Sequence, residues 1–295
     1  MTSGNTPERG NRRRLPFRLL RVSLIITVLL AAAGLFALRQ FEGAITFHPT
    51  RYAEGPEWKL PSGAEDVWLA KVDGKRLHGW FVKAAQGTVR ATIIYFHGNS
   101  GNITNVGWIG SALASRGLEV LLIDYRGYGR SEGEVTDENG INADADAAYD
   151  YLVKERGVKP ERLVLFGQSL GTTAAADLAS RRVCGALVLE SGLSSASDMA
   201  RVKLPWAPRW LAALARNRFE SARKLAAVHC PVLIAHGSND DVIPVEQGRV
   251  LYNAANEPRR LMIVQGAGHD VSGFAGDSYL DSVADFIRKA FNVRP

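Results

Sequence analysis

A serine flanked by glycines is the residue of this chain most suited to nucleophilic chemistry. The stretch "GQSLG" places Ser169 between Gly167 and Gly171. The apolar run before it indicates a buried strand, and the alanine-rich run after it indicates a helix. Side chains at both glycine positions would collide across a tight turn from strand to helix, so the pattern predicts a nucleophile in a strained turn. The alternative is a small serine that only packs in a crowded turn.

A serine hydroxyl needs a base to take its proton, and the chain has six histidines. His269 stands in "QGAGHDVSG", a loop after the last predicted strand, from which it can fold back over the serine. We therefore predict His269 as the base. The other five are expected in a connector, inside or before a strand, or packed at a strand end: His48, His78, His229, His97 and His236.

The imidazolium that forms during attack needs a buried carboxylate to orient it. The stretch "AHGSNDDVIP" supplies two candidates, Asp240 and Asp241, in the loop after another predicted strand. Only one of them can face His269. The residues alone leave both open.

The oxyanion of a tetrahedral intermediate needs N–H donors. We expect one from Leu170, which follows the serine at a helix N-terminus where the dipole helps. The second is expected from the loop "HGNSGN", and we favour the N–H of Asn99. This loop lacks the Gly-Lys-Ser/Thr ending of a phosphate-binding loop, so that reading is disfavoured.

The elements around these residues indicate an α/β fold. From residue 91 onward, short uninterrupted apolar runs alternate with helical stretches, as a doubly wound, mostly parallel sheet requires. Two strand-like runs joined at Asp73 and Gly74 lead in as antiparallel strands. Ligands bind such sheets beyond the carboxyl ends of the strands, where the candidate residues gather. Helices are predicted near 103–116, 139–156, 170–182, 245–255 and 278–291, with a core stripe of Ile141, Ala145, Ala148 and Leu152.

The positive charge of the chain is concentrated at its N-terminus. Of 36 basic and 30 acidic residues, seven arginines and one acid lie within 1–40, which leaves 29 of each in the body. The body is therefore neutral, and a nucleic-acid partner is not expected.

An apolar segment follows these arginines. Residues 22–38 carry no charge and span about 25 Å as a helix, the short end of a transmembrane length. A retained anchor is favoured over a cleaved signal peptide, because "GLFALRQFEG" offers a poor cleavage site, and over a buried soluble helix. The positive-inside rule then leaves the N-terminus in the cytoplasm and the body on the extracytoplasmic side.

We accordingly divide the chain into a basic tail at 1–18, an anchor at 19–39, an extended connector at 40–64 and one catalytic domain at 65–295. A short cap insert is expected at about 194–228. Within it Trp206 and Trp210 have helical spacing and are candidate substrate-binding residues, lining an acyl pocket or lying against anionic lipid. The alternative is that the apolar face of the insert covers the sheet.

The two cysteines, Cys184 and Cys230, lack metal-ligand spacing, so no metal site is expected. Each precedes a predicted strand. If the strands are neighbours the thiols could form a disulfide, although two small buried residues are the favoured interpretation.

Over roughly residues 65–293 the chain resembles the α/β-hydrolase superfamily. The resemblance is carried by five motifs that occur in this order: "HGN", "DYRGYGRSEG", "GQSLG", "CPVLIAHGSNDDVIP" and "GAGH". It looks most like the membrane-tethered serine hydrolases that include lysophospholipid lipases and protein depalmitoylases. The resemblance implies an eight-stranded sheet, no cofactor, and Asp240 rather than Asp241 as the acid. It also implies that Asp124, Arg126 and Ser131 brace a loop rather than catalyse.

The function expected from these observations is cleavage of a carboxylic ester or thioester, of a lipid or an acylated substrate, through an acyl-enzyme on Ser169. Two alternatives stay open. The same three residues could serve an exopeptidase or amidase. The chain could also be an inactive hydrolase fold used for binding or scaffolding.

Overall fold

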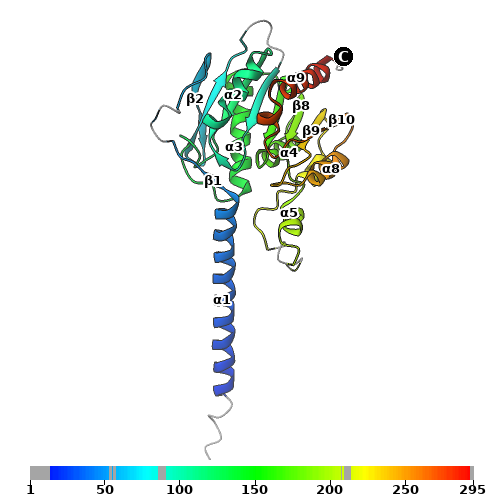
Figure 1. Ribbon diagram of the computed structural model, residues 1–295. Helices are drawn as coiled ribbons and strands as arrows, with labels where there is room; N and C mark the ends of the chain where they lie inside the picture. Colours follow the sequence, from blue (N-terminus) through cyan, green and yellow to red (C-terminus); the bar gives the residue numbers. More distant parts are fainter. Residues whose placement is uncertain are drawn as a thin grey trace, which may run out of the picture.

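The structure is a computed structural model that describes residues 14–292, apart from 53, 54, 56, 57, 86–90, 207 and 209–213. Its body is a twisted eight-stranded sheet in the order β10-β9-β8-β7-β4-β6-β3-β2 (Figure 1). The strands are β2 (Ala64–Val72), β3 (Lys75–Val82), β4 (Ala91–Phe96), β6 (Leu118–Ile123), β7 (Leu163–Gln168), β8 (Ala186–Glu190), β9 (Val232–Gly237) and β10 (Arg259–Val264).

The sheet is parallel from β6 to β10, and β2 and β3 are antiparallel to their neighbours. The sequence-based prediction of an α/β fold with a mostly parallel eight-stranded sheet is confirmed. Residues of β4 and β9 are buried throughout, which accounts for the uninterrupted apolar runs.

Helices cover both faces of the sheet (Figure 1). One face packs against α2 (Ile103–Ala114) and α9 (Val271–Asn292), and the other against α3 (Glu138–Asp150), α4 (Gly171–Arg181), α7 (Ser221–Leu225) and α8 (Val245–Ala254). A π-helical turn at Tyr151–Glu155 extends α3, and a short 3-10 turn occupies Pro160–Arg162. The predicted core stripe on α3 is fully buried: Ile141, Ala145, Ala148 and Leu152 are all 0% exposed.

The long helix α1 (Arg14–Thr46) projects from the body as a single stalk (Figure 1). Among the described residues it is the one helix long and apolar enough to cross a membrane, over Leu19–Thr46. Its most apolar stretch of 18 residues has a mean hydropathy of 2.3, and none of that stretch is buried. The predicted extended connector from residue 40 is wrong at its start, because the helix continues to Thr46. Contacts hold this last part: Glu42 accepts hydrogen bonds from the N–H groups of Arg216 and Asn217, at 2.9 and 2.6 Å.

A two-stranded parallel ladder joins the end of α1 to the body. It pairs β1 (His48–Pro49) with β5 (Ser100–Gly101), and the N–H of His48 donates to the carbonyl oxygen of Asn99 at 2.9 Å. The segment after α1 therefore lies beside the loop that carries Asn99.

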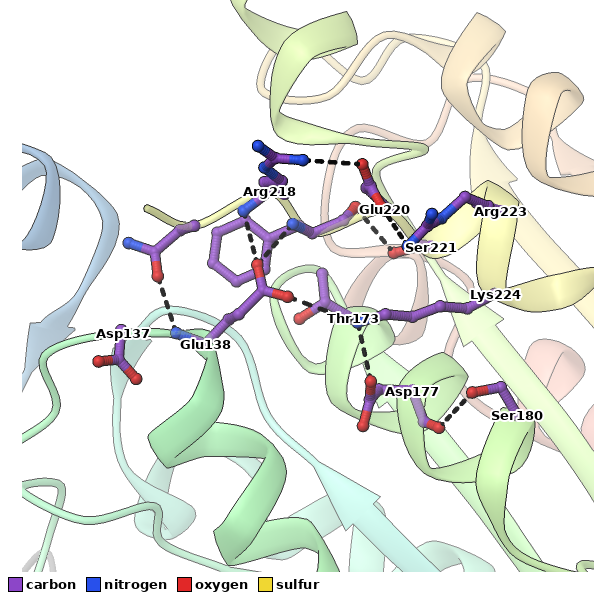
Figure 2. Close-up of polar contacts among 12 residues, drawn as sticks. Asp137, Glu138, Thr173, Asp177, Ser180, Arg218, Glu220, Ser221, Arg223 and Lys224 are labelled. Atoms are coloured by element: carbon purple, nitrogen blue, oxygen red, sulfur yellow. Dashed lines mark hydrogen bonds and ion pairs between the residues drawn. The ribbon is translucent and has the colours of Figure 1, made fainter. Parts of the chain in front are cut away.

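The insert between β8 and β9 contains α5 (Ala196–Lys203) and α7. α5 lies at the end of the body from which α1 extends (Figure 1). The insert is attached to the helices beneath it, because the carboxylate of Glu138 accepts hydrogen bonds from the N–H groups of Arg218 and Phe219 (Figure 2). Lys224 extends this contact, with its Nζ 3.5 Å from Glu138 and 2.9 Å from Asp177 on α4.

Candidate active site

Ser169 lies at the sharp turn from β7 into α4. It is 8% exposed and has a φ of +53°, a left-handed conformation that costs free energy in a non-glycine residue. The flanking glycines are required by close approach: a Cβ on Gly167 would lie 2.4 Å from the oxygen of Gly171, and a Cβ on Gly171 would lie 2.0 Å from the oxygen of Phe96. The strained turn predicted from "GQSLG" is therefore present.

The structure brings the predicted base and acid to this serine. Nε2 of His269 lies 2.9 Å from Oγ of Ser169, and Nδ1 of His269 lies 2.8 Å from Oδ2 of Asp240. An ionised carboxylate only accepts hydrogen bonds, so Nδ1 of His269 carries the proton and Nε2 is left to accept from the serine hydroxyl. This is the tautomer that a general base needs.

Asp240 is held as a carboxylate by its surroundings. Burial raises its pKa, but hydrogen bonds from His236, His269 and the N–H of Ile243 outweigh burial and bring the pKa below its ordinary value. Oδ1 accepts the N–H groups of Val242 and Ile243, both at 2.9 Å. Its side chain is 0% exposed.

The neighbouring Asp241 is exposed and has no contact with His269, while its carbonyl oxygen accepts a hydrogen bond from Lys203 at 2.9 Å. The geometry therefore pairs His269 with Asp240 and not with Asp241.

Two backbone N–H groups near Ser169 were predicted to hold the oxyanion. In the part of the chain described, neither the N–H of Asn99 nor that of Leu170 donates to another protein group. The loop before Asn99 approaches the serine closely, since a Cβ built on Gly98 would lie 3.5 Å from the Cβ of Ser169. The N–H of Asn99 shares its peptide plane with the carbonyl group of Gly98. The Gly98 oxygen lies 2.8 Å from Nδ1 of His97, and this contact helps to orient the plane. Both N–H groups are thus available to a negative oxygen.

His97, at a strand end near Ser169, packs as expected and does not act on the serine. Its Nδ1 contacts the oxygen of Gly98 at 2.8 Å, and its ring lies against Tyr125 and Tyr128. Burial lowers its pKa, so the neutral ring is favoured.

Asp124, Ser131 and Arg126, which were expected to hold the loop after β6 in place, form hydrogen bonds and an ion pair within and beside that loop. Asp124 accepts the N–H of Ile103 at 2.9 Å and so fixes the start of α2. Ser131 donates to the oxygen of Asp124 at 2.6 Å, and Arg126 pairs with Asp144 at 2.8 Å. None of the three contacts the Ser169 hydroxyl.

A buried network behind the site was missed by the sequence analysis. Glu190, at the end of β8, is fully buried and accepts the hydroxyl of Ser272 at 2.6 Å and its N–H at 3.1 Å. Burial raises the pKa of Glu190. The hydroxyl of Ser191 donates to the oxygen of His269 at 2.7 Å. These contacts tie both sides of the His269 loop to the strand beside Ser169.

The signal for this network was the position of the two residues directly after an apolar strand, at the active edge of the sheet. Glu190 contacts Ser272, which is 82 residues away in the sequence, and Ser191 contacts His269, which is 78 residues away. Sequence spacing alone does not connect them.

A cavity of about 490 Å³ opens beside Ser169 and His269. One wall comes from α2, where Trp108 is 44% exposed and Ile109 lies beside it. Trp206 does not line this cavity and is 78% exposed to solvent. Trp210 lies outside the described residues. Among the described residues, Trp108 from α2 is therefore the tryptophan that lines the cavity beside Ser169.

The remaining sequence-based candidates concern metals and thiols. Among the described residues no group of three His, Cys, Asp or Glu side chains is arranged to hold a metal ion. The Sγ atoms of Cys184 and Cys230 lie 3.3 Å apart in the core. The two thiols are therefore in contact, but the distance is longer than the ~2.05 Å of a disulfide bond.

Comparison with known proteins agrees with the fold and places the chain among hydrolases. The family model described as serine aminopeptidase, S33 (Hydrolase_4) matches residues 87–223. The uncharacterized protein Rv2307c of Mycobacterium tuberculosis is 35% identical over 271 residues, which is 92% of this chain and 95% of that protein. The alpha/beta hydrolase domain-containing protein 17C of Mus musculus is 33% identical over 248 residues, 83% of this chain and 74% of that protein.

A solved structure has the same fold. The esterase Pf2001 of Pyrococcus furiosus superimposes with a TM-score of 0.65 at 22% identity, over 82% of this chain and 98% of the esterase.

Proposed function

The chain belongs to the α/β-hydrolase family, and from this premise we propose that it is a serine hydrolase that cleaves a carboxylic ester or thioester through an acyl-enzyme on Ser169. The observation that carries the proposal is the continuous path of hydrogen bonds from Ser169 through His269 to Asp240, at 2.9 and 2.8 Å. It ends on a carboxylate whose pKa is held below its ordinary value.

In the first half of the reaction the serine Oγ attacks the substrate carbonyl carbon, and His269 Nε2 takes the hydroxyl proton. Asp240 stabilises the imidazolium through Nδ1. The N–H groups of Asn99 and Leu170 donate to the oxyanion. The tetrahedral species collapses when His269 returns the proton to the leaving alcohol or thiol, and the acyl group stays on the serine.

In the second half water attacks the acyl-enzyme. His269 takes a proton from this water, and the same two N–H groups hold the new oxyanion. Collapse breaks the bond between Oγ and the acyl carbon, His269 returns the proton to Oγ, and the carboxylic acid leaves. No group beyond these side chains and backbone donors is needed.

The proposed acyl-binding surface is the α2 wall of the cavity, since Val106, Trp108 and Ile109 are the apolar side chains that line it there. A role for Trp206 in substrate binding remains a proposal that the cavity lining does not support. The resemblance to membrane-tethered hydrolases favours a substrate with a long acyl chain.

An aminopeptidase is the second candidate, because the matching family model carries that description. Acyl transfer to serine is common to both reactions. The discriminating experiment compares p-nitrophenyl esters of rising chain length with aminoacyl p-nitroanilides, using purified full chain and Ser169→Ala. We expect ester hydrolysis that Ser169→Ala abolishes. Hydrolysis of the anilides at rates above the esters would contradict the proposal.

We also propose that α1 is retained as a membrane anchor, with the basic tail in the cytoplasm and the hydrolase domain on the other side. The arginines before the span and its uncharged length support this orientation. Protease added to cells with opened outer layers should digest the domain. Protection of the domain until the inner membrane is opened would contradict the orientation.

A further inference from the structure

A second cavity, of about 500 Å³, lies where α1 meets the body of the protein. Its α1 wall is formed by Arg39 and Gly43, which lie one turn apart on the same face of the helix. Phe47 follows directly after the end of α1, and its N–H donates to the oxygen of Gly43 at 3.0 Å. The opposite wall comes from the segment after α1 and from the loop after β6, and the cap insert adds one residue. The lining also includes Ala44, Arg51, Glu134, Val135 and Arg216.

Three arginines from three separate segments meet in this cavity. Arg51 is oriented by two backbone oxygens, those of Ser131 at 3.0 Å and Gly133 at 2.5 Å, which use two of its five N–H donors. Arg39 is exposed and makes no ion pair within the described part of the chain. Arg216 pairs with Asp137.

Two of the three guanidinium groups have no carboxylate partner among the described residues. Arg216 pairs with Asp137, whereas no ion pair joins Arg39 or Arg51 to the nearby acids Glu42 and Glu134. A phosphodiester carries one negative charge, and guanidinium groups are the donors best matched to phosphate oxygens. Phe47, Ala44 and Val135 add apolar surface beside the arginines.

The wall that carries Arg216 is tied to the anchor helix. Glu42 on α1 accepts the N–H groups of Arg216 and Asn217, and Asn217 in turn accepts the N–H of Glu138 at 2.7 Å. Glu138 also holds the following residues of the insert (Figure 2). Hydrogen bonds among α1, the cap insert and α3 therefore fix the walls of the cavity, and its shape does not depend on one flexible side chain.

The position of Arg39 along α1 sets the height of the cavity in a bilayer. The uncharged run at residues 22–38 is flanked by Arg21 and Arg39. As a helix it spans about 25 Å, slightly less than the ~30 Å hydrocarbon core, so both arginines reach the headgroup level. The cavity then opens at the depth of lipid phosphates.

We propose that this cavity binds the phosphate of an anionic phospholipid headgroup, in the leaflet from which α1 emerges. The inference rests on the proposed retention of α1 as an anchor, and it is independent of the proposed hydrolysis. Arg39 and Arg51 donate to the phosphate oxygens, and Phe47 and Val135 contact the glycerol end. A headgroup bound there bridges α1, the loop after β6 and the cap insert, and fixes the body against the membrane surface.

The test uses the full chain in detergent and counts bound lipid by native mass spectrometry. Phosphatidylglycerol and phosphatidylcholine are titrated separately, and glycerol 3-phosphate is added as a soluble source of the same phosphate. We expect preferential binding of phosphatidylglycerol to the wild type. Loss of one arginine contact should weaken it about fivefold, as in Arg39→Gln or Arg51→Gln.

Arg249→Gln is the matched control, because Arg249 is an exposed arginine on α8 that lines neither this cavity nor that beside Ser169. It should bind lipid as the wild type does. Arg39→Gln keeps the test valid if Arg51→Gln disturbs the loop that it orients.

Three results would overturn the proposal: equal binding of both lipids by the wild type, equal weakening in Arg249→Gln, or full displacement of the lipid by glycerol 3-phosphate at equal concentration. Hydrolysis of a p-nitrophenyl ester is measured on the same samples, with Ser169→Ala as the inactive reference. An inactive chain that still selects phosphatidylglycerol would count against the proposed function alone. A purified chain whose mass lacks the N-terminal segment would count against the anchor.

Discussion

Replacing Asp240 by asparagine tests the acid of the proposed triad against its immediate neighbour. Asparagine keeps the size of the side chain and retains one oxygen for the N–H groups of Val242 and Ile243. Its amide nitrogen cannot accept the proton that His269 donates from Nδ1. The ring is then free to adopt the other tautomer, with the proton on Nε2, where it blocks acceptance from Ser169.

We expect Asp240→Asn to lower kcat by about four orders of magnitude, which corresponds to about 5 kcal/mol of transition-state stabilisation. KM should change little, because Asp240 does not line the cavity beside Ser169. The control is Asp241→Asn, one residue away, exposed and without contact to His269. It should leave kcat within about twofold of the wild type, as is usual for a surface substitution.

The same variant has a signature in the stability of the protein. The pKa of Asp240 is lower in the folded chain than its ordinary value of 3.8, so ionisation stabilises the fold above pH 3.8 and this contribution is lost as pH falls through the folded pKa. Asp240→Asn should therefore unfold more easily than the wild type at neutral pH, by about 1–3 kcal/mol, and the difference should shrink below pH 3.8.

The assays are steady-state hydrolysis of a p-nitrophenyl ester and urea unfolding followed by circular dichroism, each over a pH series. Equal loss of kcat in both aspartate variants would refute the assignment. So would an Asp240→Asn protein that folds and retains wild-type kcat.

Three further substitutions probe the turn, the buried network and the cavity wall, and Trp206→Ala serves as the control for the third. Gly171→Ala should destabilise the fold by at least about 3 kcal/mol in urea unfolding, because its Cβ would lie 2.0 Å from the oxygen of Phe96; wild-type stability would refute the close approach. Glu190→Gln should lower kcat about tenfold at unchanged KM, since the loop of the catalytic histidine loses one acceptor. Burial raises the pKa of Glu190, so its ionisation costs stability as pH rises above 4.5, and the stability deficit of the glutamine variant should narrow over that range; a deficit independent of pH would contradict this. Trp108→Ala should raise KM for long-chain esters more than for acetate, whereas Trp206→Ala should not; the reverse pattern would move the acyl site to the cap insert.

Much of the fold could be predicted because short apolar runs alternate with helical stretches along most of the chain. Strands buried on both faces read as short apolar runs, and the helix stripe that includes Ile141 and Ala145 is fully buried as expected. Candidate residues at strand ends meet because the carboxyl ends of parallel strands share one edge. This is why Ser169 and His269, a hundred residues apart, lie in contact.

Other features depend on contacts that no local pattern records. Asp240 and Asp241 are adjacent and chemically identical, and only the packing of the loop against His269 distinguishes them in space. The continuation of α1 to Thr46 depends on Glu42, whose partners are on the cap insert far along the chain. The wall of the cavity comes from α2 because the Asn99 loop leads directly into that helix, while an aromatic pair in the insert gave the stronger sequence signal.

Covalent labelling tests whether Ser169 is the nucleophile, as we propose. The full chain is treated with a fluorophosphonate, which reacts with activated serines, and the product is analysed by intact mass and peptide mapping. We expect one phosphonyl group per chain, on Ser169, and none on folded Ser169→Ala. A folded wild-type chain that stays unlabelled, or a label that maps to another residue, would contradict it.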